Sequence, residues 1–137
     1  PNLVNLSGTK TAFCLDVYSP FDQQHPLDGS SRSNIPVNLK VEDATDYEQT
    51  TGNTAYVSNT GWQTVFFDLT EGLQPALANS PGYVSDYGDG TFEKVVINVE
   101  GDNLPSSLSY YFDNLELIGD ENFDEVIDIN DCGYSAL

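Results

Sequence analysis

The chain has 137 residues, of which 22 are acidic and four are basic, so its net charge is −18. Four cations cannot neutralise a phosphate backbone, which excludes a nucleic-acid binder, and the same charge disfavours an anionic membrane surface. No apolar run approaches the ~20 residues of a membrane-spanning helix. The length suits a single domain over 1–137, and an aromatic content of 12% favours a packed core over disorder.

Short segments in which apolar and polar residues alternate recur along the chain and predict β-strands. The expected strands are 11–18, 37–42, 54–58, 62–69, 94–100 and 108–118, with a long loop at 19–34, a polar turn at 43–52 and a loop-rich stretch at 70–91 that includes a candidate helical turn at 72–79. The side chains expected to face the core are Phe13, Leu15, Val17, Val37, Leu39, Val41, Val65, Phe67 and Leu69. This organisation predicts an all-β fold, an antiparallel β-sandwich of two sheets.

The acidic tail, residues 119–137, mixes carboxylates with apolar side chains. One interpretation is an acidic linker to a following domain. Four apolar residues and a cysteine exceed what a linker needs, so we favour a last strand at 125–129 that packs back on the sheets. Because the chain begins at Pro1 without a signal peptide, we expect it to be a piece excised from a larger multidomain protein.

The two cysteines are Cys14, in the first expected strand, and Cys132, in the tail. A disulfide between them would close a long loop and would fit an exported protein. Two free, buried thiols fit the sequence equally well.

The excess of carboxylates also bears on ligands. It repels anionic glycans, leaves neutral molecules unaffected and attracts divalent cations, although it also simply keeps an extracellular protein in solution. Oxygen ligands for Ca²⁺ are abundant, and we expect one structural calcium ion. The candidate ligands are the turn at 86–91, Glu42 with its acidic neighbours, and Asp113.

Catalytic residues are harder to find. The only histidine, His25, precedes a proline in a polar loop, which is typical of plain surface, so we do not expect a nucleophilic triad. Four carboxylates fall within expected strands, namely Asp16, Glu42, Glu100 and Asp113. A carboxylate on a strand face can be solvated, ligate a metal or act in catalysis, and we rank these roles in that order.

An aromatic platform is predicted by the segment WQTVFFDL. Alternation places Trp62 and Phe66 on the face opposite the core, and Tyr18 on the outward face of its own strand. Large exposed rings are costly unless they serve a ligand, and a sugar ring stacks well on such a surface. The alternative is that the loop at 19–34 or the tail covers this face.

The segments PVNLKVEDATDYEQ, TGWQTVFFDLTE, FEKVVINVEGD and SYYFDNLELIG resemble, in this order, four strands of the jelly-roll carbohydrate-binding modules of secreted laminarinases, xylanases and related glycoside hydrolases. FCLDVYSP resembles the strand before them, so the resemblance spans about 13–118. It implies a jelly-roll fold that binds polysaccharide without cleaving it, and a structural Ca²⁺ held in part by Asp113. The chain departs from the family in Asn114, where a second aspartate is usual, in Phe66, where a small polar residue is usual, and in lacking the N-terminal strand before Pro1.

These observations favour a non-catalytic module of a secreted or cell-surface protein, which binds a neutral polysaccharide such as a β-glucan through Trp62, Phe66 and Tyr18. Its other partners would be further domains of the same chain. The first alternative is a calcium-stabilised spacer or adhesin domain. The second is a small jelly-roll glycoside hydrolase or lyase that uses two strand carboxylates.

Overall fold

The computed structural model describes residues 4–6, 8–19, 35–46, 50–58, 60–69, 90–99 and 109–134. Strands dominate these residues, and all their pairings are antiparallel, which confirms the all-β prediction. The elements are β1 (Val4–Asn5), β2 (Ala12–Ser19), β3 (Ile35–Glu42), β4 (Thr50–Val57), β5 (Gly61–Asp68), β6 (Thr91–Phe92), β7 (Lys94–Val99), β8 (Tyr111–Ile118) and a 3₁₀ helix, η2 (Ile129–Asp131).

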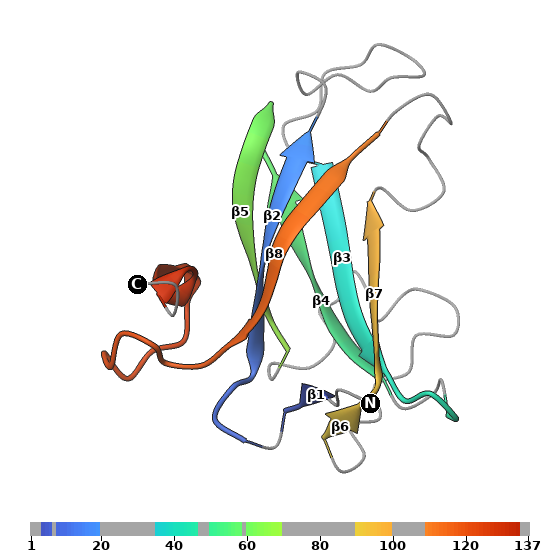
Figure 1. Ribbon diagram of the computed structural model, residues 1–137, viewed down its shortest axis with the longest axis vertical. Helices are drawn as coiled ribbons and strands as arrows, with labels where there is room; N and C mark the ends of the chain where they lie inside the picture. The colour runs from blue at the N-terminus through green and yellow to red at the C-terminus, as the bar shows by residue number, and fades with distance from the viewer. Residues whose placement is uncertain are drawn as a thin grey trace.

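The six long strands form two three-stranded sheets, in the orders β5-β2-β8 and β4-β3-β7, and β1 pairs with β6 in a short ribbon. Figure 1 shows β5, β2 and β8 side by side, with β4, β3 and β7 forming the other group of neighbouring strands. The chain therefore crosses between the sheets from β2 to β3 and again from β4 to β5, whereas β3 and β4 are neighbours in one sheet. The central strand β2 takes both of its partners from distant parts of the sequence.

One hydrophobic core joins the two three-stranded sheets, because a single cluster of buried side chains draws on both. Every side chain predicted to face the core is at most 3% exposed, which confirms the alternation read from the sequence. Burying an aliphatic or aromatic side chain of this size contributes about 1.5–3 kcal/mol. This shared core fixes which face of each sheet remains outside.

The structure differs from the predicted polar turn at 43–52, because β4 begins at Thr50. Thr50 and Thr51 are buried, and their hydroxyls donate to the backbone oxygens of Val41, at 2.7 Å, and Leu69, at 3.2 Å. Bonds of this kind let a polar residue occupy a buried strand. The short strands β1 and β6 were also not predicted.

The predicted strand at 125–129 is wrong. Phe123 and Glu125 adopt positive φ angles of 61° and 70°, far from those of a regular strand, and residues 125–129 form no strand. Side-chain oxygens of Asp120 and Asp131 accept the backbone N–H groups of their neighbours in place of a strand partner. The tail therefore forms a series of turns that ends in η2, whose N-cap is Asp128.

The tail does pack back on the fold, as expected. Cys132 is joined to Cys14 of β2 by a disulfide across 118 residues, which decides between the two interpretations of the cysteines. Ile127 packs against a second small cluster that contains Cys14 and Ile118. In Figure 1 the tail leaves the end of β8 and lies to the side of the β5-β2-β8 sheet.

Several predictions fall on parts of the chain outside the described residues: the loop at 20–34 with His25, the helical turn at 72–79, most of the turn at 86–91, and Glu100. Within the described ranges, no helix has the length and apolar character needed to cross a membrane.

Candidate functional site

The outer face of the β5-β2-β8 sheet, which points away from the core, carries three rows of side chains set by the register of the strands. Each row takes one residue from β5, one from β2 and one from β8. The rows are Trp62–Tyr18–Tyr111, Thr64–Asp16–Asp113 and Phe66–Cys14–Glu116.

The first row is aromatic. The ring of Tyr18 makes edge contacts with both neighbours, at centroid distances of 5.5 Å to Trp62 and 5.8 Å to Tyr111. Edge-to-face contacts of this kind stabilise the arrangement by about 0.5–1.5 kcal/mol each. Trp62 is nevertheless 57% exposed and Tyr111 is 58% exposed, so two held rings remain open to a ligand.

The second row is polar and centred on Asp16. One carboxylate oxygen of Asp16 accepts the hydroxyl of Thr64 at 2.5 Å, and the other accepts the side-chain N–H of Asn114 at 2.8 Å. Asp113 accepts the backbone N–H of Asn114 at 2.8 Å. Each carboxylate oxygen can accept two hydrogen bonds, so these fixed groups keep acceptor capacity for the hydroxyls of a ligand.

A β-bulge in β8 brings Asn114 to this face. Cys14 pairs with Glu116 and Asp16 pairs with Asp113, so the register shifts by one residue between the two pairs. Asn114 lies in the bulge with φ of 51°, a conformation that asparagine tolerates better than most residues. Its amide supplies the donor to Asp16 that a second aspartate, the usual residue of the resembling family, would lack.

Two hollows flank the polar row. One has a volume of ≈ 310 Å³ and is lined by Asp16, Trp62, Gln63, Thr64, Asp113 and Asn114. The other has a volume of ≈ 250 Å³ and is lined by Cys14, Asp16, Thr64, Asn114, Glu116, Cys132 and Gly133. Because they share residues of the polar row, we treat them as one feature, the outer groove, which follows β2 from the aromatic row to the disulfide.

Two of the three predicted platform residues meet here, since Tyr18 contacts Trp62. Phe66 lies on the same face, but Thr64 separates it from Trp62, and it packs half-buried against the small cluster around Cys14. Tyr111 was not predicted as a ring of this face. Its alternation with Asp113 carried a signal, but only the pairing of β8 with β2 places it beside Tyr18.

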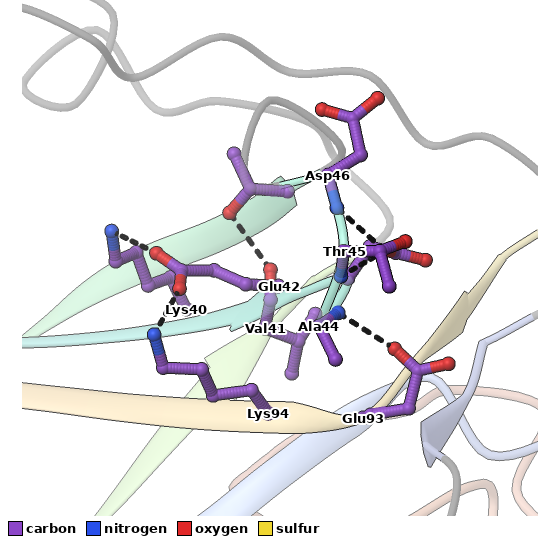
Figure 2. A network of polar contacts seen from close by, with 10 residues as sticks. Lys40, Val41, Glu42, Ala44, Thr45, Asp46, Glu93 and Lys94 are labelled. Carbon is purple, nitrogen blue, oxygen red and sulfur yellow. Dashed lines mark hydrogen bonds and ion pairs between the residues drawn. The ribbon is translucent and has the colours of Figure 1, made fainter.

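The two predicted calcium ligands do not meet, because Glu42 lies on β3 and Asp113 lies on β8 of the other sheet. The carboxylate of Glu42 instead forms ion pairs with Lys40 and with Lys94, the latter at 2.8 Å (Figure 2). Burial raises the pKa of Glu42, but the hydrogen bonds and charges of the two lysines outweigh burial and leave the pKa below its usual value. A carboxylate neutralised by two cations is a poor ligand for a third.

Across the described ranges, no three His, Cys, Asp or Glu residues converge as ligands for a metal. One segment of the tail nevertheless has a notable spacing of oxygen-bearing side chains. Counted from Asp120, the first, third, fifth, ninth and twelfth residues of this segment are Asp120, Asn122, Asp124, Asp128 and Asp131. These are side-chain ligand positions of the EF-hand calcium loop, although an EF-hand has glycine sixth and glutamate twelfth.

The sixth residue of this segment, Glu125, takes the left-handed conformation that glycine usually supplies, with φ of 70°. Asp120 accepts the backbone N–H of Glu125 at 2.9 Å and that of Asp124 at 3.0 Å. Asp131 is fully buried and accepts the N–H groups of Glu121, Asn122 and Asp128. Burial raises the pKa of Asp131, but these three hydrogen bonds lower it by more, so the pKa lies below its usual value.

Comparison with models of known families, with curated proteins and with solved structures finds no match to this chain. The resemblance to carbohydrate-binding modules therefore continues to depend on the residues of the chain.

Proposed function

We propose that this protein is a jelly-roll β-sandwich module that binds a neutral polysaccharide, a β-glucan or similar chain, in the outer groove and does not cleave it. The observation that carries the proposal is the aromatic row of Trp62, Tyr18 and Tyr111 beside the fixed polar row around Asp16. The disulfide between Cys14 and Cys132 suits an oxidising compartment, so the proposed location is secreted or cell-surface. Further domains of the same chain are its proposed partners.

The two rows match the two kinds of surface on a sugar ring. The C–H face of a pyranose is apolar and stacks on the open rings of Trp62 and Tyr111, while its hydroxyls donate to Asp16 and Asp113. The hydroxyls give up bonds to water in exchange, so we expect modest affinity. The described residues that line the groove include no Lys or Arg, which disfavours anionic chains.

The test is affinity electrophoresis and pull-down of the protein against laminarin, mixed-linkage glucan, xylan and cellulose, with Trp62→Ala and Tyr111→Ala variants. Each variant should lose about tenfold in affinity, equivalent to ~1.4 kcal/mol. Tyr56→Ala is the matched control, because Tyr56 is 51% exposed on β4 of the other sheet. Unchanged binding in a folded Trp62→Ala, Tyr111→Ala double variant would refute the proposal.

A second candidate function, a calcium-stabilised spacer domain, is supported by the oxygen spacing of 120–131. Its test is thermal unfolding in Ca²⁺, in Mg²⁺ and in EDTA. A rise of the melting temperature in Ca²⁺ alone, abolished by Asp124→Asn but retained by the exposed-residue control Glu125→Gln, would support it. Such a rise, combined with no binding to any glycan, would replace the first proposal by this one.

A third candidate function is a hydrolase, because Asp16 of β2 and Asp113 of β8 lie opposite each other in the strand register. Two carboxylates on one face are the groups that glycosidases use. Release of reducing ends from a bound glycan, lost in Asp113→Asn, would assign catalysis to the groove. Binding without release supports the non-catalytic module.

A further inference from the structure

We infer that the C-terminal tail completes the ligand groove. In this inference Cys132 and Gly133 form the wall of a second sugar subsite, and the ligand is an oligosaccharide chain along β2 rather than one terminal ring. The inference rests on the proposed function, because it extends the same groove. It adds a role in ligand binding for a segment that the sequence analysis treated as a linker or a strand.

The groove is continuous across its two hollows. Asp16, Thr64 and Asn114 line both hollows, so a ligand in one hollow touches residues that also line the other. Tyr18 and Cys14, in the two outer rows, are four residues apart on β2, which corresponds to about 13 Å in an extended strand. That span is longer than a single hexose ring. Each hollow alone lies near the lower limit of small-molecule pockets, ~300–1,000 Å³.

The tail is held in place rather than loosely attached. At its start, Gly119 approaches the backbone so closely that a Cβ there would lie 2.4 Å from the carbonyl oxygen of Thr9. Lys10 then pairs with Glu121 at 3.3 Å, and the disulfide fixes Cys132 on β2. The segment from Gly119 to Cys132 is thus fixed at both ends, so the wall keeps its shape when a ligand arrives. This lowers the entropic cost of binding.

The chemistry of the second hollow also suits a sugar. It is lined by Cys14 and Cys132, whose disulfide is weakly polar, by Gly133, whose bare backbone can form hydrogen bonds, and by Glu116 with the polar row. Gly133 has no side chain, and the position of its missing Cβ faces open space, so the wall leaves room for a ligand. The second hollow thus sets a disulfide beside hydrogen-bonding groups, where the first hollow sets the ring of Trp62 beside Asp16 and Asp113.

The experiment measures the dependence of affinity on chain length. Isothermal titration with the disaccharide and the hexasaccharide of laminarin should give a hexasaccharide affinity at least about tenfold higher. Several docking registers alone raise the affinity of a long chain only a few-fold, so variants supply the decisive comparison. Glu116→Ala leaves the disulfide intact and should bring the hexasaccharide within a few-fold of the disaccharide, whereas Trp62→Ala should weaken both.

A Cys14→Ser, Cys132→Ser double variant, which frees the tail, should lose the same length advantage while it still binds the disaccharide. If this variant does not fold, Gly133→Asn tests the tail instead, because it places a side chain in the open space at Gly133, in a conformation that asparagine tolerates, and should remove the same length advantage. Equal affinities for the two sugars in the wild type, or an undiminished advantage in Glu116→Ala, would overturn the inference and leave the proposed function standing. Failure of the wild type to bind either sugar, together with no retention on laminarin, mixed-linkage glucan, xylan or cellulose, would overturn both.

Discussion

At the scale of single residues, Glu42 holds two of the four basic side chains of the protein. We expect Glu42→Gln to lower the stability at neutral pH by about 1–2 kcal/mol, since it removes two charge-assisted hydrogen bonds that are partly screened by solvent. Thermal unfolding checks this, with Glu125→Gln as the control for the loss of one surface carboxylate. A variant as stable as the wild type would show that the two ion pairs contribute nothing.

The same residue predicts a pH dependence. The pKa of Glu42 is lower in the folded protein than in the unfolded chain, so the unfolded chain takes up its proton first as the pH falls. The contribution of Glu42 to the free energy of unfolding is therefore fully present above its pKa in the unfolded chain, about 4.3. This contribution is lost as the pH falls through the lower pKa of Glu42 in the folded protein. The difference in stability between the wild type and Glu42→Gln, measured by thermal unfolding, should shrink over this acidic range and persist at neutral pH.

Two variants of Asn114 separate its backbone conformation, which bears on stability, from its side-chain amide, which bears on glycan binding. Asn114→Val places a β-branched residue at φ of 51° and should cost about 1–3 kcal/mol of stability. Asn114→Gly accepts that conformation but removes the bond to Asp16, so it should retain the fold and bind glycan more weakly. Unfolding and glycan titration of both variants test this pair. Normal glycan affinity in Asn114→Gly would remove the amide from the site.

The residues of the site were predictable only in part. Period-two alternation placed Trp62 and Tyr18 on the outer face, because that pattern depends on neighbours along one strand. The contact of Tyr111 with Tyr18, and the bond of Asn114 to Asp16, depend on β8 lying beside β2 and on a bulge between them. No local pattern in the sequence specifies either of these.

At the scale of elements, the tail shows how polar side chains can override an apolar pattern. The alternation at 125–129 predicted a strand, but the aspartates around it accept backbone N–H groups and fold the segment into turns. The six long strands were predicted because packing requires their alternation. Their order in the sheets was not, since every pairing of β2 joins distant segments.

The disulfide between Cys14 and Cys132 is expected to stabilise the fold. Because it closes a loop across 118 residues, replacing both Cys14 and Cys132 by serine should lower the stability by about 2–4 kcal/mol. The strands and their core do not depend on the tail, so the far-ultraviolet spectrum should stay that of a β protein. Limited proteolysis should then cleave within 119–134 first. An unchanged melting temperature would show that the bridge does not constrain the unfolded chain.

At the scale of the whole molecule, the charge of −18 acts on folding and on ligand choice in different ways. Like charges repel one another in the compact state, so screening by salt should raise the melting temperature. The carboxylates of the groove add a local repulsion against anionic chains. Stacking on Trp62 and Tyr111 involves no net charge and should be insensitive to ionic strength.

The two effects of charge can be tested together by measuring the melting temperature, the affinity for a neutral glucan and the binding of alginate as the salt concentration changes. Between low salt and about 1 M NaCl, where the Debye length falls to ~3 Å, the melting temperature should rise. The affinity for a neutral glucan should change by less than about twofold, because no ion pair forms or breaks on stacking. Alginate should not bind at low salt in the presence of EDTA. Tight, salt-sensitive binding of alginate under those conditions would require a cationic surface outside the outer groove, and would show that the groove is not the main glycan site.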